Sequence, residues 1–75
     1  MAEMESARIE VGFDGGQIMS ALVTVESAEA LERAINARSE GTLALDAQDG
    51  RYTLVLQRLV YVKRFAREAR VGFGI

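Results

Sequence analysis

The sequence of 75 residues contains no cysteine, histidine, proline or tryptophan. Without thiolate and imidazole side chains, the common zinc, haem and iron–sulfur sites cannot form, and catalysis by Cys, Ser-His or His is excluded. A disulfide framework is excluded too, so core packing or oligomerisation must stabilise the fold. We therefore expect no cofactor, no metal and no enzymatic activity.

Long apolar runs are absent as well, and the start of the chain does not look like a signal peptide. No run approaches the roughly 20 apolar residues of a membrane span, and residues 1–5 are acidic where a signal peptide is basic and then apolar. These features predict a cytoplasmic protein that does not contact a membrane. Residues 1–7 show no apolar period and are predicted to be a disordered leader to one α+β domain over residues 8–75.

The chain is nevertheless rich in apolar residues, which make up 49% of it, while aromatic residues make up 7%. A small aliphatic core barely offsets the conformational entropy lost on folding, which favours a homo-oligomer, most simply a dimer. The closing residues alternate apolar side chains with glycine and have no turn to bring them back. The candidate residues for self-association are Val71, Phe73 and Ile75.

The first half of the chain predicts a β-hairpin followed by a helix. Residues 9–13 alternate in the period of a strand, Asp14-Gly15-Gly16 suits a tight turn, and residues 17–25 form the returning strand. Ser27 is the expected N-cap of a helix over residues 28–38. The row of the second strand that we expect to face the core consists of Met19, Ala21, Val23 and Val25, the apolar helix stripe contains Leu31 and Ile35, and Gly41 is the expected stop.

The second half is again β in pattern. Residues 42–45 and 51–56 form a second predicted hairpin around the turn at 46–50. Residues 59–62 form a continuous apolar run, which is typical of an interior strand covered on both faces. Residues 63–70 are basic and form either helical turns or a loop.

The order hairpin, helix, hairpin, strand is ββαββ(β). This is the order of a β-grasp, ubiquitin-like domain, in which a mixed sheet carries one helix packed on one face. The alternative is a small Sm-like or SH3-like barrel formed by coiling of the long strands.

Three parts of the chain carry a family resemblance: residues 9–13, residues 41–51, and residues 59–62 together with the closing residues 70–74, Arg-Val-Gly-Phe-Gly. Over residues 8–74 this combination resembles the small actinobacterial family named only as domain of unknown function 3107. The resemblance implies a fold and a lineage of short cytoplasmic proteins, without an assigned reaction. The family pattern has an acid after Tyr61-Val62, where this chain has Lys63-Arg64.

Charge divides along the chain. Residues 1–49 carry ten acids and three arginines, a net charge of −7, and residues 50–75 carry six bases and one acid, a net charge of +5. Cations beside an aromatic ring can follow a phosphate backbone and stack a base, although a solvated surface or neutralisation between the two halves explains the same pattern. The candidate partner or nucleic-acid surface consists of Arg58, Lys63, Arg64, Phe65, Arg67 and Arg70.

The remaining motifs point to turns. Gly12, Gly15 and Gly16 match neither nucleotide-binding glycine pattern, and Asp46 and Asp49 lack the ligand array of a calcium loop. The sequence therefore predicts a non-enzymatic interaction or scaffold module with an unknown protein partner. The alternative is nucleic-acid binding, of RNA above all, through the basic residues 58–70.

Overall fold

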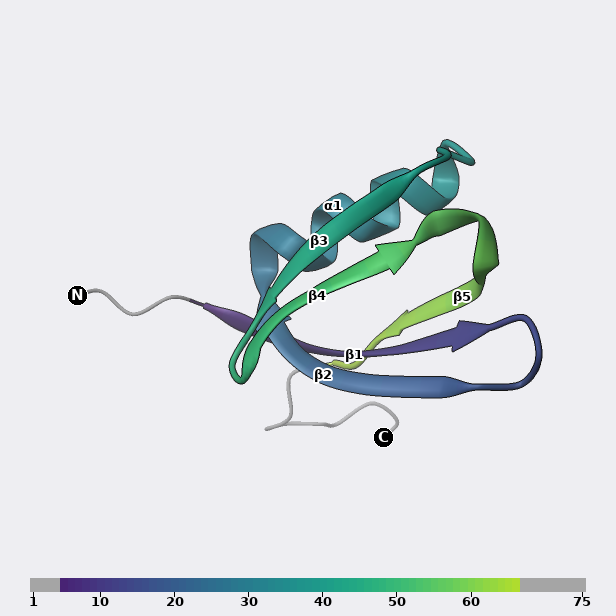
Figure 1. Cartoon of the computed structure of the whole chain (residues 1–75). Coiled ribbons are helices and arrows are strands. Elements are labelled where there is room, and N and C mark those ends of the chain that lie inside the picture. Colours follow the sequence, from purple (N-terminus) through teal and green to yellow (C-terminus); the bar gives the residue numbers. More distant parts are fainter. Residues whose placement is uncertain (1–4, 67–75) are drawn as a thin grey trace, which may run out of the picture.

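Two β-hairpins flank one helix, and a fifth strand follows them (Figure 1). The computed structural model describes residues 5–66. The predicted α+β class with one helix between two hairpins is confirmed. In chain order the elements are β1 (Ser6–Phe13), β2 (Ile18–Thr24), α1 (Val25–Asn36), β3 (Thr42–Ala47), β4 (Gly50–Val55), the 3-10 turn η1 (Leu56–Arg58) and β5 (Leu59–Arg64).

All described strand pairs are antiparallel, in the sheet order β4-β3-β2-β1-β5. The prediction of a mixed sheet is therefore wrong for the described residues, and the β-grasp order is not confirmed. The difference arises at β5, which starts beside Phe13 at the end of β1 and runs back along β1, so that Ile9 faces Arg64. A β-grasp sheet would need these two strands to be parallel.

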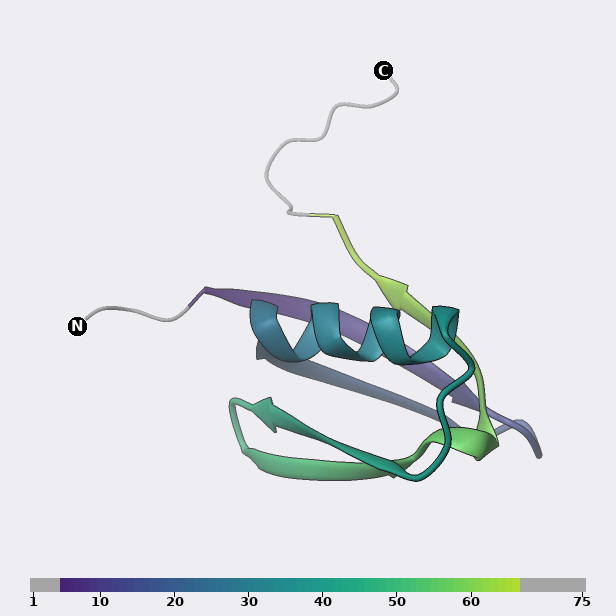
Figure 2. The same ribbon diagram turned by 90° about the horizontal axis from the view of Figure 1, so that it is seen from above.

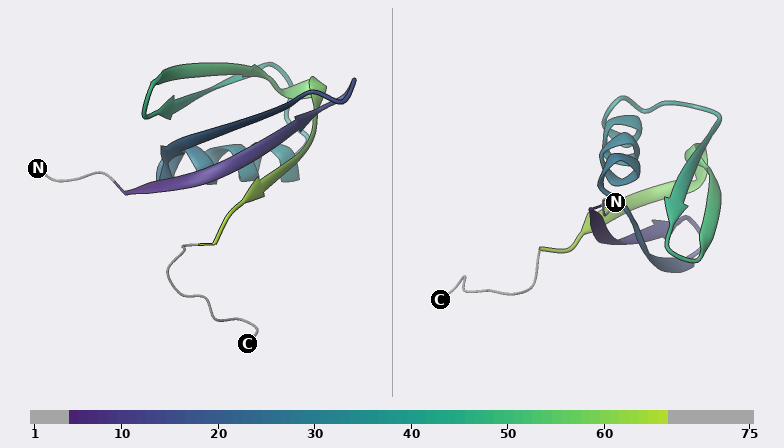
Figure 3. Two further views of the ribbon diagram at one scale, coloured as in Figure 1. Left: turned by 90° about the horizontal axis from the view of Figure 1, so that it is seen from below. Right: turned by 90° about the vertical axis from the view of Figure 1, so that its left-hand side faces the viewer.

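The sheet is curled because its two edge strands are neighbours in the sequence. β4 and β5 lie at opposite edges, yet only the three residues of η1 join them. The amide of Asp14 donates a hydrogen bond of 2.9 Å to the carbonyl of Arg58, which fixes η1 to the first hairpin. Helix α1 contacts both β3 and β5, and it covers the concave side of the curled sheet (Figures 2 and 3).

The core lies between α1 and the concave face of the sheet. β1 contributes alternate residues to it, as the period of two predicts. Within the expected row of β2, Val23 is buried while Met19 and Ala21 are half-buried. In the expected helix stripe Leu31 is buried and Ile35 is half-buried. The buried apolar residues are Ile9, Val11, Val23, Ala28, Leu31, Leu45 and Leu54.

The helix starts and ends earlier than its sequence pattern predicts. Thr24 is the N-cap, because its Oγ1 accepts a hydrogen bond of 3.0 Å from the amide of Ser27. Ser27, the expected cap, lies inside the helix, and its Oγ accepts from the amide of Asp46 at 2.9 Å. The helix ends at Asn36, before the expected stop at Gly41, and Arg38 takes the left-handed conformation at φ 56°.

β5 is an edge strand, and the prediction of an interior strand covered on both faces is wrong. Its register with β1 shifts between Gly12 and Phe13, so Val60 is an extra residue without a partner in β1. The side chain of Val60 is 63% exposed as a result. An apolar run alone does not distinguish a covered strand from an edge strand that contains a bulge.

The ends of the domain differ in part from the prediction. β1 begins at Ser6, so the last two residues of the predicted leader pair with β2. Residues 63–64, which were expected in helical turns or a loop, belong to β5, and residues 65–66 have no regular structure. Residues 1–4 of the predicted leader, the residues from 67 on and the self-association residues Val71, Phe73 and Ile75 lie outside the described residues. No helix in the described part is long and apolar enough to span a membrane.

Gly12 is required by a side chain that crosses it. A Cβ at this position would lie 2.1 Å from Cε2 of Tyr61, which is far closer than van der Waals contact. The Tyr61 ring passes over β1 here, and its hydroxyl donates a hydrogen bond of 2.6 Å to Oε2 of Glu10. Because Gly12 has no side chain, the Tyr61 ring of β5 can lie against β1.

We predict that Gly12→Ala destabilises the protein by about 1–2 kcal/mol, because the added methyl displaces the Tyr61 ring and breaks its hydrogen bond. Chemical denaturation measures the change in the free energy of unfolding. In a Tyr61→Ala background the same substitution should cost much less, since no ring then opposes the methyl. An equal cost in both backgrounds would show that the ring is not the cause.

Candidate functional site

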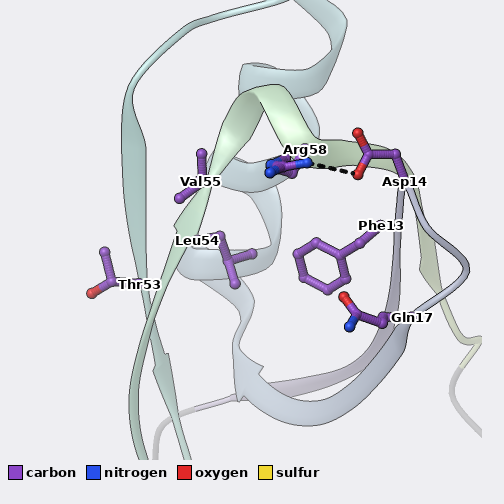
Figure 4. A pocket seen from close by; sticks show the side chains of 7 residues that line it. All are labelled: Phe13, Asp14, Gln17, Thr53, Leu54, Val55 and Arg58. Carbon is purple, nitrogen blue, oxygen red and sulfur yellow. Dashed lines mark hydrogen bonds and ion pairs between the residues drawn. The ribbon is translucent and has the colours of Figure 1, made fainter.

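A cleft of about 410 Å³ lies between the tip of the β1–β2 hairpin and β4 (Figure 4). Phe13 and Leu54 point toward one another across it, so its interior is apolar. Gln17 adds an amide beside the Phe13 ring, whereas the side chain of Thr53 points away from Phe13. The lining residues are Phe13, Asp14, Gln17, Thr53, Leu54, Val55 and Arg58.

β2 and β3 meet at one end only. Val23 and Ala47 are their single paired position, extended by a hydrogen bond of 2.8 Å from the amide of Gln48 to the carbonyl of Leu22. Toward Ile18 the two strands diverge. The first half of β2 therefore has no strand partner on the side away from β1.

The backbone groups on that side of β2 can be identified from the register. The amide of Phe13 donates to the carbonyl of Gln17 at 2.9 Å, so residue 17 and every second residue after it bond to β1. The intervening residues turn their amide and carbonyl groups the other way, as the bond accepted by Leu22 shows. At the cleft end of β2, the backbone groups of Ile18 and Ser20 thus point away from β1.

The same reasoning applies to β4. The amide of Leu56 donates to the carbonyl of Gly41 at 2.9 Å, so Leu54 and Tyr52 are the residues of β4 that bond to β3. Thr53 and Val55 turn their amide and carbonyl groups toward the free edge of β4. Both residues line the cleft. The free edge of β4 therefore borders the apolar space, whereas Ile18 and Ser20 are not among its lining residues.

An ion pair closes one end of the cleft. Nη1 of Arg58 lies 3.3 Å from Oδ1 of Asp14, and both side chains are largely exposed. An exposed pair of this kind contributes at most about 1 kcal/mol. Together with the backbone hydrogen bond between the same residues, it holds the hairpin tip against η1.

The predicted basic surface is not one continuous patch in the described residues. Arg58 lies at the cleft beside Asp14, whereas Nη1 of Arg64 pairs with Oε1 of Glu32 on the helix at 3.3 Å. Lys63 faces Glu10 across the strands, on the side of the sheet opposite to Arg64. Its Nζ lies 4.5 Å from the ring centroid of Phe65. Arg67 and Arg70 lie outside the described residues.

The predicted turn carboxylates bind their neighbours. Asp46 pairs with Arg51 at 3.3 Å, and Asp49 accepts a hydrogen bond of 2.8 Å from the hydroxyl of Tyr52. Among residues 5–66, no group of three or more acidic, His or Cys side chains could hold a metal ion.

The sequence pattern did not identify most of the cleft. Of the lining residues, the pattern singled out Arg58 as a candidate, and it did so for a different surface. In the sequence, Phe13 and Leu54 look like ordinary core residues, because the period of two gives a residue's face but not which strand lies opposite.

No family model, curated protein or solved structure matches the chain.

Two tyrosines donate hydrogen bonds to carboxylates. The bond to Glu10 raises the pKa of Tyr61 above its ordinary value near 10, with smaller contributions from burial and from the charge of Glu10. The bond to Asp49 raises the pKa of Tyr52, with smaller contributions from the charge of Asp49 and from burial. Because these pKa values are higher in the folded state, the stabilisation is complete below about pH 10 and is lost as the pH rises through the raised pKa.

We predict that Glu10→Gln lowers the pKa of Tyr61 toward its ordinary value and leaves the pKa of Tyr52 unchanged, because the charged acceptor is removed from one ring only. Asp49→Asn, the matched variant, should change Tyr52 and spare Tyr61. An NMR titration of the ring signals measures both. If Glu10→Gln moved both tyrosines equally, the Tyr61–Glu10 bond would not be the source of the shift.

Proposed function

We propose that this protein is a non-enzymatic interaction module that binds an extended polypeptide segment in the cleft. The observation that carries the proposal is the unpaired edge of β4 at Thr53–Val55 beside an apolar interior. An added strand can satisfy such backbone groups, while its side chains enter pockets that select the sequence. The cleft volume of about 410 Å³ lies in the usual range for ligand sites.

The contrast between the sheet edges supports this proposal. The free edge of β5 carries Lys63, Arg64 and the bulge at Val60, all features that discourage pairing with another strand. The cleft edge of β4 carries the uncharged residues Thr53 and Val55. Val55 is 49% exposed. An edge without such protection suits the addition of a strand.

The charged groups of the cleft also favour binding over acid–base chemistry. Asp14 and Arg58 neutralise each other at the rim, and both are well exposed to solvent. The apolar interior then selects segments with an apolar side chain at the position facing Phe13 and Leu54.

The curl of the sheet and the family resemblance belong to the same proposal. We infer that the sheet coils into a barrel-like form whose seam is the cleft, since both of its edges meet at η1. On the residues that carry the resemblance, we assign the chain to the lineage of the domain of unknown function 3107 and place it in the cytoplasm.

Nucleic-acid binding is a second candidate, favoured by the stacking of Lys63 on Phe65. It receives less support because Arg58 and Arg64 each pair with an acid. Binding of this kind falls steeply with salt, because counterions are released from the phosphates. Absence of a signal with mixed oligonucleotides at about 50 mM salt would remove this candidate.

Peptide binding tests the first candidate. We predict that a synthetic hexapeptide that alternates threonine with valine and phenylalanine shifts the amide NMR signals of Thr53 and Val55. A peptide with aspartate in place of phenylalanine should bind at least about tenfold more weakly, because a charge cannot enter the apolar interior without a partner.

Two proline variants of β4 provide the matched comparison. Thr53→Pro removes an amide that faces the cleft, and Arg51→Pro removes an amide on the same edge outside the lining residues. Neither amide bonds to β3. Thr53→Pro should weaken peptide binding about tenfold or more, while Arg51→Pro leaves it unchanged. Equal peptide binding by the folded variants would contradict strand addition in the cleft.

A further inference from the structure

We propose that the outer face of the sheet binds single-stranded nucleic acid, with a base stacked on Tyr61 and phosphates bound by Lys63 and Arg8. This face is formed by β1, β2 and β5, on the side of the sheet away from α1 (Figure 3). None of its residues lines the cleft. The inference therefore goes beyond the proposed function of the cleft, and it assigns nucleic-acid binding to a surface other than the predicted basic one.

The strand register determines which side chains share the outer face. β1 buries Ile9 and Val11 in the core, so the residues between and beside them face outward. The same alternation applies to the residues that lie opposite them in β2 and β5. The carbonyl of Arg8 accepts a hydrogen bond of 2.9 Å from the amide of Phe65, which extends the register by one position. The outer residues are Ser6, Arg8, Glu10 and Gly12 of β1, Ile18, Ser20, Leu22 and Thr24 of β2, Tyr61 and Lys63 of β5, and Phe65.

The ring of Tyr61 offers one of its faces to a ligand. A Cβ added at Gly12 would lie closest to Cε2 of the ring, with the neighbouring atoms Cδ2 and Cζ at 2.6 and 2.7 Å. Distances this similar place Gly12 under the face of the ring and not at its edge. Tyr61 is 38% exposed, so the opposite face of the ring is open to solvent. The hydrogen bond to Glu10 fixes the ring in this position before a base stacks on it.

The net charge of the outer face differs in sign from that of the domain. Residues 5–66 carry nine acids and seven bases, a net charge of −2. The outer face carries the two cations Arg8 and Lys63 and one acid, Glu10, a net charge of +1. The three ion pairs within residues 5–66 involve other cations. Arg8 and Lys63 are therefore available to phosphates.

The two cations lie at a suitable distance from the ring. Lys63 follows Tyr61 by two residues, about 7 Å along the strand. Arg8 is the diagonal neighbour of Lys63 on β1, about 7–8 Å away. Nζ of Lys63 lies 4.5 Å from the ring centroid of Phe65, a contact that orders the side chain while its N–H groups can still donate to a phosphate.

A stacking ring beside unpaired cations distinguishes nucleic acid from an acidic protein. Carboxylates would use the cations alone, whereas each nucleotide supplies both a planar base and a phosphate. Open antiparallel sheets of other proteins bind single-stranded RNA in this way, with bases stacked on aromatic side chains. In a duplex the faces of the bases are covered by their neighbours, so the ring selects a single strand.

Fluorescence anisotropy of a short labelled oligouridine at about 50 mM salt tests the proposal. We expect a dissociation constant of about 1–100 μM, because few phosphates are bound. With two phosphate contacts, the logarithm of the affinity should fall with the logarithm of the salt concentration at a slope of about −1.4.

Four variants separate stacking from charge. Tyr61→Leu removes the stacking ring and should weaken binding about tenfold or more, whereas Tyr61→Phe keeps the ring and should bind within about threefold of the unaltered protein. Lys63→Gln should reduce the salt slope by about 0.7. Arg33→Gln is the matched control, because it removes an exposed arginine of α1, and it should leave both affinity and slope unchanged.

Several results would overturn the proposal. These are no binding at about 50 mM salt, equal binding by Tyr61→Leu that is folded by circular dichroism, and equal salt slopes for Lys63→Gln and Arg33→Gln. The last comparison does not depend on whether Tyr61→Leu folds. If polyglutamate displaces the oligouridine at an equal concentration of charges, the face recognises negative charge alone, and an acidic protein replaces nucleic acid as the partner.

Amide NMR signals distinguish this surface from the cleft. The oligouridine should shift the signals of Ser20 and Lys63 and spare those of Thr53 and Val55, which the hexapeptide should shift. If the oligouridine shifts Thr53 and Val55 alone, it binds the cleft and the outer face is excluded. Failure of the hexapeptide to bind would remove the proposed function and leave the outer face untouched, because the two surfaces share no residue.

Discussion

The short link between β4 and β5 is the constraint on which the rest of this structure depends. Two strands at opposite edges of a sheet must come together at one end when three residues join them. The sheet therefore curls, and its concave side encloses the aliphatic core against α1. In a flat sheet of the same strands, α1 alone would cover Ile9, Val11 and Leu45. The curl adds the neighbouring strands to their surroundings.

The curl is incomplete on one side, and the cleft follows from this. β2 and β3 separate beyond Val23 and Ala47, because β3 also packs against α1. The hairpin β3–β4 then brings β4 opposite the tip of the first hairpin. An apolar space beside the unpaired edge of β4 is the physical result, and the binding role proposed above rests on these backbone groups.

The charge division along the sequence is largely balanced within the fold. Asp14 pairs with Arg58 and Glu32 pairs with Arg64, so acids of the first half meet bases of the second. Lys63 lies opposite Glu10 in the register of β1 and β5. Among the interpretations that the sequence left open, neutralisation between the halves therefore has direct structural support in the described residues.

The sequence by itself determined the local elements. The alternation in β1, the glycine turn after Asp14 and the helix stripe at Leu31 depend on neighbours in the chain, and all three are present. Tertiary structure decided the direction of β5, the exposure of Val60 and the position of the cleft. A period of two specifies which residues share a face, but it does not specify which strand lies alongside or where two strands part. Those outcomes depend on contacts between residues far apart in the sequence, such as Gly12 with Tyr61 and Ser27 with Asp46.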